Sequence, residues 1–136
     1  MSYDNEFVNC CLRESNFYLN VKKAHPTEDE FNGLLKHINN FYTACEMTNK
    51  KVGMIINAKE LGLIDYKYAD SFSSYFKKNE DIVKNCIIAT SIICDNVVIC
   101  NLVNAFLKIY KSIKPVKVLQ TIEKGVDFIN GINYKK

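Results

Sequence analysis

The residues of this chain that could do chemistry are few, and their spacing matches no catalytic motif. His25 and His37 are the two histidines of the 136-residue sequence, and no motif places a serine or cysteine nucleophile beside either of them. Because a nucleophile needs its base within hydrogen-bond reach, we do not expect nucleophilic catalysis. The sequence therefore predicts a protein that is not an enzyme.

The six cysteines are not spaced like the ligands of a metal site. Zinc sites use pairs of ligands a few residues apart, whereas Cys10 and Cys11 are adjacent and the other four cysteines are well separated. The first nine residues are too polar for a secretory signal peptide. We therefore expect reduced thiols in a cytoplasmic protein that holds neither a metal nor a cofactor.

Polar residues at the ends of two apolar runs are the remaining candidates for a site. Asp95 and Asn96 follow the run 87–94, and Thr121 follows the run 116–119. The carboxyl ends of parallel strands meet at one edge of a sheet, where helix N-termini can bind anions. These three residues therefore form a candidate anion-binding rim. The alternative is that they cap the helices that follow.

An alternation of apolar runs and helical patterns predicts the elements that position these residues. Three β-branched runs are each followed by a helical pattern, which favours a mostly parallel sheet covered by helices. The runs are 52–56, 87–94 and 116–119, and the helical patterns are 68–78, 97–110 and 122–129, the last expected to end at Gly131. Runs 6–13 and 16–21 predict a leading β-hairpin, and Thr27 with Glu30 forms a capping box that opens another helix. We expect one α/β domain over residues 1–136, with about five strands and four helices.

Charge and apolar content argue against two classes of partner. The net charge is +3, the lysines are scattered and Arg13 is the single arginine, so we expect no nucleic-acid binding. Residues 87–110 carry few charges, but Asp95 lies in their middle and would be costly in a bilayer. We predict a buried strand and a mostly buried helix for this segment, and no transmembrane span.

The order of the predicted elements resembles the STAS domain and its SpoIIAA-like relatives, including the STAS/SEC14 group, over about residues 7–129. The most specific part is 52–65 (VGMIINAKELGLID), which is similar to the family's apolar strand, turn and helix-opening Asp. In the anti-anti-sigma members this turn ends in Asp-x-Ser, and phosphorylation of the serine breaks binding to a partner kinase. Here Asp65 matches, but Tyr66 follows and Lys67 occupies the serine position. The resemblance therefore implies an interaction domain without the phosphoswitch.

A protein-binding domain of this kind is the leading functional hypothesis. The resemblance implies a compact, non-enzymatic module that uses the loop and helix after the strand 52–56, and it also implies a homodimer. An exposed apolar or aromatic patch is expected there. The partner-binding residues on this hypothesis are Asn57, Leu61, Gly62, Leu63, Asp65, Tyr66, Lys67, Tyr68 and Ser71.

Two other hypotheses remain open. The SEC14 side of the resemblance suggests binding of a lipid or small apolar molecule in a cavity between sheet and helices. That cavity would be lined by Ile38, Phe41, Phe72, Phe106 and Tyr110. The last hypothesis is an enzyme whose site lies along the rim and uses a perturbed carboxylate such as Asp65 or Asp95.

Overall fold

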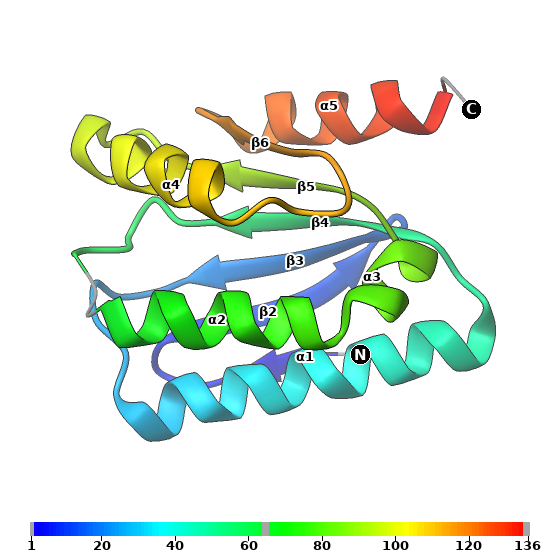
Figure 1. The fold of residues 1–136 in the computed structure, drawn as a ribbon, viewed down its shortest axis with the longest axis horizontal. Coiled ribbons are helices and arrows are strands. Elements are labelled where there is room, and N and C mark those ends of the chain that lie inside the picture. The colour runs from blue at the N-terminus through cyan, green and yellow to red at the C-terminus, as the bar shows by residue number, and fades with distance from the viewer. Residues whose placement is uncertain (1, 64–65, 135–136) are drawn as a thin grey trace.

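Six strands form one mixed sheet within residues 2–63 and 66–134, which the computed structural model describes (Figure 1). Neighbours in the sheet are also neighbours in the chain. The strands are β1 (Ser2–Asp4), β2 (Val8–Arg13), β3 (Asn16–Val21), β4 (Val52–Asn57), β5 (Ile87–Ile93) and β6 (Val116–Leu119). β2 is antiparallel to both β1 and β3, whereas β3, β4, β5 and β6 run parallel. The parallel strands need long crossovers, which helices supply.

The leading β-hairpin is confirmed. β2 and β3 are joined by the two-residue turn Glu14–Ser15, with Arg13 paired to Asn16. Both turn residues have positive φ, 51° and 73°, as a type I′ turn requires to match the twist of the strands. β1 adds a short antiparallel strand at the edge that the sequence pattern did not predict, because three residues are too few to show an alternation.

Helix α1 (Glu28–Thr48) begins where its capping box predicts. The Glu30 amide donates to Thr27 Oγ1 at 3.2 Å, and the Thr27 amide donates to Glu30 Oε1 at 2.8 Å. The helix ends at Asn49, which adopts the left-handed conformation with φ 53°. Its apolar face packs on the sheet, where the ring of Phe41 stacks on that of Phe17 with centroids 4.2 Å apart.

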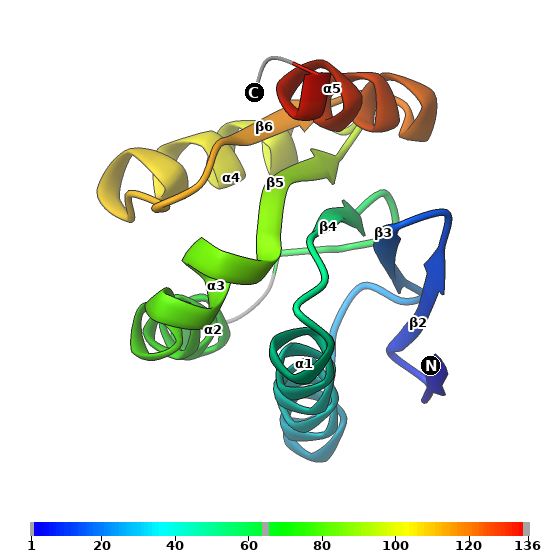
Figure 2. The same cartoon turned by 90° about the vertical axis from the view of Figure 1, so that its right-hand side faces the viewer.

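The helices cover both faces of the sheet. α1, α2 (Tyr66–Lys78), α3 (Glu80–Cys86) and α4 (Val97–Ile109) lie on one side, and α5 (Ile122–Tyr134) lies on the other (Figure 2). Side chains that alternate along a strand point to opposite faces. Phe17 and Leu19 therefore join the core under α1, whereas Tyr18 joins a second core with Ile129 of α5.

Helix α5 approaches the sheet closely at a glycine. A Cβ on Gly125 would lie 2.7 Å from Ile93 Cδ1 and 3.1 Å from Ser91 Cβ. The buried Ser91 hydroxyl donates to the Gly125 carbonyl at 2.8 Å. The small residue and the hydrogen bond together hold α5 against the middle of β5.

Three details of the predicted elements were wrong. A separate short helix, α3, follows α2 directly. α5 continues past Gly131 to Tyr134, because Gly131 does not take the positive φ that ends a helix. α4 is not mostly buried: among its described side chains Ile99 is the buried one. The sheet ends at β6, a four-residue edge strand, so α4 has only a narrow surface to pack against.

Candidate binding surface on helix α4

Helix α4 is apolar over most of its length, and its first turn is well capped. Its sequence, VVICNLVNAFLKI, contains three strongly polar residues, Asn101, Asn104 and Lys108. The Asn96 side-chain oxygen accepts hydrogen bonds from the Val98 amide at 2.9 Å and the Ile99 amide at 3.2 Å. The cap fixes where the helix begins, directly after β5.

Two apolar stripes run along α4 on different sides. Ile99, Val103, Phe106 and Tyr110 recur at helical spacing and are buried or half-buried, so they form the packed side. A second stripe, which we call the outer stripe, recurs at the same spacing and is exposed. It consists of Val98 (58% exposed), Leu102 (52%), Ala105 and Ile109 (82%).

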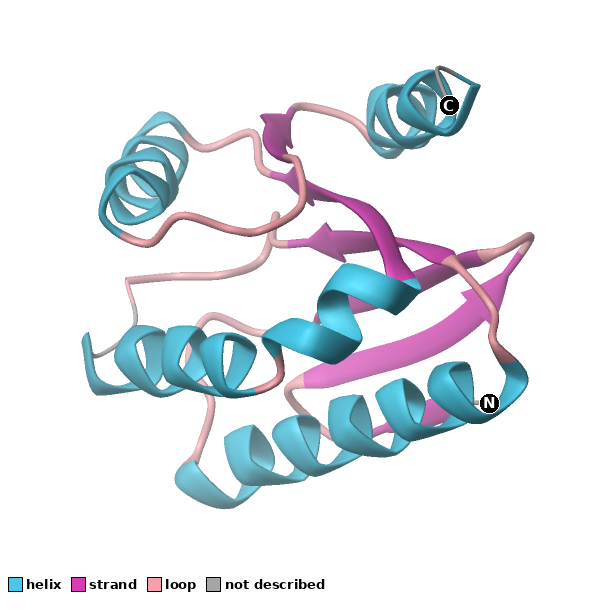
Figure 3. Cartoon of the chain, turned by 45° about the vertical axis from the view of Figure 1, so that its right-hand side comes forward, coloured by secondary structure: helices cyan, strands magenta, loops and turns pink. Residues whose placement is uncertain are grey.

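Exposed large apolar side chains are concentrated at this helix. In the described part of the chain seven large apolar residues are strongly exposed, and five of them lie between residues 97 and 113. Val97 and Ile113 are exposed just beyond the two ends of the outer stripe, and Met47 and Leu63 are the two elsewhere. Single exposed apolar residues are ordinary, but a contiguous group marks an interaction surface. Figure 3 shows α4 at the periphery of the molecule.

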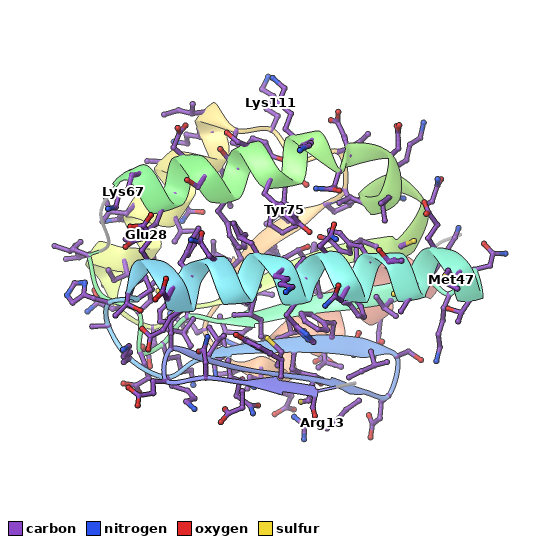
Figure 4. All side chains as sticks on the ribbon, turned by 90° about the horizontal axis from the view of Figure 1, so that it is seen from below. Arg13, Glu28, Met47, Lys67, Tyr75 and Lys111 are labelled. Carbon is purple, nitrogen blue, oxygen red and sulfur yellow. The ribbon has the colours of Figure 1, made fainter. Side chains whose placement is uncertain are left out.

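Lysines accompany the outer stripe. Lys108, Lys111 and Lys114 follow one another at the end of α4 and in the segment after it, and the sequence has no Asp or Glu between Asp95 and Glu123. Lys111 projects away from the body of the protein (Figure 4). Glu80 of α3 adds to burial in raising the pKa of Tyr110, which directly follows α4. The surface is therefore apolar with a positive end.

Two shallow depressions adjoin α4. One, of about 530 Å³, lies between α4 and β6 and includes Ala105 and Lys108 in its lining. The other, of about 480 Å³, lies under the segment after α4 and includes Tyr110 and Ile113. Of the residues predicted to line a lipid cavity, Tyr110 contributes to one of these depressions. Ile38 and Phe41 are instead packed in the core under α1.

The described residues of the segment predicted to bind a partner do not form the expected exposed apolar patch. Leu63 is 61% exposed, but Leu61 is half-buried against the core under α1. Tyr68 packs on Phe31, with ring centroids 4.9 Å apart. Asp65 and the side chain of Tyr66 lie outside the described residues. Of the expected patch, Leu63 is thus the described apolar residue that is open to solvent.

The other predicted residues of that segment are mostly polar, and their contacts reach both neighbouring residues and the distant Ala24. The Asn57 side-chain oxygen accepts from the Lys59 amide at 3.3 Å, and the Gly62 amide donates to the Ala24 carbonyl at 3.0 Å. Lys67 is exposed, with its ammonium 5.1 Å from the centre of the Tyr68 ring, and Ser71 is exposed on α2. Partner binding by this segment stays a prediction.

Two of the three rim residues, Asn96 and Thr121, act as helix caps. Asn96 caps α4, and the Thr121 hydroxyl oxygen accepts from the Lys124 amide at 3.1 Å in the first turn of α5. Asp95 is exposed between β5 and α4. Two of the three polar side chains are thus engaged by backbone amides, and an anion site at this rim stays a prediction.

Several titratable groups with strongly shifted pKa values lie in the core, whereas Cys100, whose pKa burial raises to about 11, is half-buried on α4. Burial raises the pKa of the Cys10 thiol to about 12 and that of the Cys45 thiol to about 11. It also raises the pKa of the Tyr42 hydroxyl well above its ordinary value. Burial also lowers the pKa of His37, whose ring stacks on Tyr3 with centroids 4.9 Å apart. These groups are held neutral, and a neutral thiol is a poor nucleophile.

Metal-ligating side chains do not converge in the part of the chain that is described. No group of three or more His, Cys, Asp or Glu residues there is placed to hold a metal ion. All six cysteines are free thiols, and Cys100 Sγ donates to the Cys94 carbonyl at 3.2 Å. Each helix within the described residues is too short or too polar to reach across a bilayer.

The outer stripe is the feature that sequence analysis missed. A signal for it exists in the sequence, because a helix that packs one face against a sheet needs one apolar stripe, and 97–109 carries two. The sequence pattern predicted only that this helix is mostly buried. Whether the second stripe is exposed depends on where the sheet ends, and the sequence of the helix alone does not give that information.

Comparison with solved structures places the fold. The chain is similar to an uncharacterized protein from the DUF3478 family with a SpoIIAA-like fold from Shewanella loihica PV-4. The sequences are 12% identical, the TM-score is 0.62, and the match covers 95% of this chain and 98% of that chain. Neither a protein-family model nor a curated protein matches the chain. The likeness shows a SpoIIAA-like fold, which confirms the predicted fold class.

Proposed function

We propose that this chain is a non-enzymatic interaction domain and that the outer stripe of α4 is its contact surface. The observation that carries the proposal is the exposure of Val98, Leu102 and Ile109 on one side of a capped helix. Full burial of one such side chain contributes roughly 1.5–3 kcal/mol. Because these three are already partly covered, a partner that buried them would gain on the order of 1 kcal/mol from each.

The chemistry of the chain supports binding rather than catalysis. Cys10 and Tyr42, whose pKa values are strongly raised by burial, are packed in the core and held in their neutral forms. A catalytic group is instead expected in a cleft with a functional neighbour. Asn96 and Thr121, at the strand-end rim, are occupied as helix caps. Surface complementarity is therefore the proposed mode of action.

The SpoIIAA-like fold is compatible with this role, and the sequence bears on its regulation. By the resemblance to the anti-anti-sigma members, Lys67 stands at the position of the phosphorylated serine. Lysine cannot carry that modification, so we propose that binding by this domain is not controlled by a phosphoswitch at this position.

A photo-crosslinking experiment in the protein's own cells tests the proposal for any class of partner. A photoreactive amino acid is placed at Ile109 in one variant and at Met47, on α1, in the control, because both positions are 82% exposed. We expect discrete adducts from position 109 and only diffuse background from position 47. Equal adduct yields from the two positions would contradict the proposal, since exposure alone would then account for the labelling.

A further inference from the structure

We infer that the partner of the outer stripe is an anionic lipid surface. The inference rests on the proposed function, because it names the partner of the same contact surface. It goes further in stating what the partner must be: a fluid apolar layer beneath a negatively charged interface. The apolar side chains, the lysines and the shape of the surface each bear on that choice.

The apolar side chains have the arrangement of a helix that lies in a membrane interface. Val98, Leu102, Ala105 and Ile109 form one line along about 16 Å of α4, given 1.5 Å of rise per residue. Val97 and Ile113 are exposed at the two ends of this line. An interfacial helix inserts such a line of aliphatic side chains into the boundary between headgroups and acyl chains.

The lysines supply the charge that such a helix uses. Lys108, Lys111 and Lys114 accompany the outer stripe, and no acidic residue occurs in the sequence from 96 to 122. Lys117 is set apart from them, because its ammonium lies over the Phe128 ring of α5 at 5.7 Å. Each lysine near an anionic leaflet strengthens binding by about fivefold. The three together therefore favour an anionic over a zwitterionic surface.

The outer stripe lacks the features of a protein-binding hot spot. Such hot spots are rich in Trp, Tyr and Arg and pair with pockets, whereas the stripe is aliphatic and contains none of these residues. The adjoining depressions are shallow and are lined in part by Asn101, Asn104 and lysines. A lipid layer needs no pocket and adapts to a row of aliphatic side chains, so it suits this surface better than a rigid protein.

A second copy of this chain is also disfavoured by charge. A two-fold symmetric contact pairs the same patch on both copies. Stripe-to-stripe packing would bring Lys108 and Lys111 of each copy into one interface, with no acidic residue from the same segment to oppose them. An anionic lipid surface removes this repulsion because it supplies the missing negative charge.

Vesicle sedimentation with the purified full chain tests the inference. The vesicles are phosphatidylcholine alone or phosphatidylcholine mixed with phosphatidylglycerol. The variants are L102D/I109D for the stripe and K108Q/K111Q for the charge, with M47D as a matched control on α1, at a position as exposed as Ile109. Circular dichroism checks that each variant is folded, and the exposed positions make loss of the fold unexpected.

We expect the wild type to bind the anionic vesicles at least about tenfold more tightly than the neutral ones. L102D/I109D should lose binding about tenfold or more, since two charges replace inserted side chains. K108Q/K111Q should bind anionic vesicles about 25-fold more weakly, at about fivefold for each lysine, with no change on neutral vesicles, and M47D should leave binding unchanged. Added salt should weaken the binding of the wild type to anionic vesicles toward that of K108Q/K111Q.

Two outcomes would overturn the inference but leave the proposed function standing, and a third would contradict both. If no vesicle is bound but position 109 crosslinks to a protein, the partner is a protein and the proposed function stands. If the wild type is a dimer in solution that L102D/I109D converts to a monomer, the partner is a second copy. If vesicles, crosslinks and self-association are all absent, the inference and the proposed function both fail.

Discussion

The same substitution at two glycines of α5 is expected to change stability in opposite directions. Gly125 and Gly131 both lie within this helix, where replacing glycine by alanine gains about 0.5–1 kcal/mol in backbone entropy. At Gly131 a Cβ would meet no atom within 4 Å, so nothing opposes the gain. We expect Gly131→Ala to raise the free energy of unfolding by about 0.5 kcal/mol. This value is at the low end of the range because Gly131 lies near the C-terminal end of the helix.

At Gly125 the gain is outweighed by crowding. The added Cβ would lie 2.7 Å from Ile93 Cδ1 and 3.1 Å from Ser91 Cβ, and the latter belongs to a central strand that cannot move freely. Overpacking of this kind costs about 1–3 kcal/mol. A shift of α5 would also lengthen the 2.8 Å hydrogen bond from the Ser91 hydroxyl to the Gly125 carbonyl. We expect Gly125→Ala to lower the free energy of unfolding by about 1–2 kcal/mol.

Urea unfolding followed by circular dichroism measures both values. The slope of the free energy against urea should be the same for the wild type and both variants, so that the midpoints compare stability directly. The two variants should differ by about 2 kcal/mol. If both substitutions stabilised the protein equally, α5 could not lie against β5 at Gly125, and the account of the second core would be refuted.

Two further predictions concern buried polar groups. Among the described residues the buried Tyr42 hydroxyl has no hydrogen-bond partner, so Tyr42→Phe should raise the free energy of unfolding by about 1 kcal/mol. Tyr75→Phe is the control. A clear decrease in the free energy of unfolding for Tyr42→Phe would mean that the hydroxyl does have a partner. Burial holds the pKa of His37 below its usual 6.5, so the unfolded chain takes up the proton more readily and stability falls as pH drops below about 6.5. His37→Phe should flatten this part of the curve of unfolding free energy against pH.

Elements specified by local signals were predictable from sequence. The capping box of Thr27 and Glu30 set the start of α1. The β-branched run 116–119 matched β6 at both ends, and the hairpin was marked by two runs separated by a two-residue turn. In each case the residues that determine the element lie within a few positions of one another, so no long-range information was needed.

Features that depend on contacts between distant segments were not predictable. Leu61 reads as a loop residue, but the core under α1 covers it, and Tyr68 meets Phe31 across a large sequence separation. Conversely, the helix 97–110 was predicted to be mostly buried, whereas Leu102 and Ile109 are exposed, because the sheet offers α4 only one short edge strand. Whether a side chain is buried depends on the segments that pack against it. This explains why the exposed apolar surface lies on α4 rather than at residues 57–71, where it was predicted.

The central claim is that the outer stripe of α4 is covered when the protein acts. Hydroxyl-radical footprinting of the variant L102M tests it, comparing oxidation at position 102 with oxidation at Met47 in the same molecule, first purified and then in intact cells. Met47 is exposed on α1 and corrects for the delivery of radicals. We expect oxidation at position 102, relative to Met47, to fall several-fold in cells. An unchanged ratio would mean that the stripe stays open to solvent in the cell, and would contradict the account.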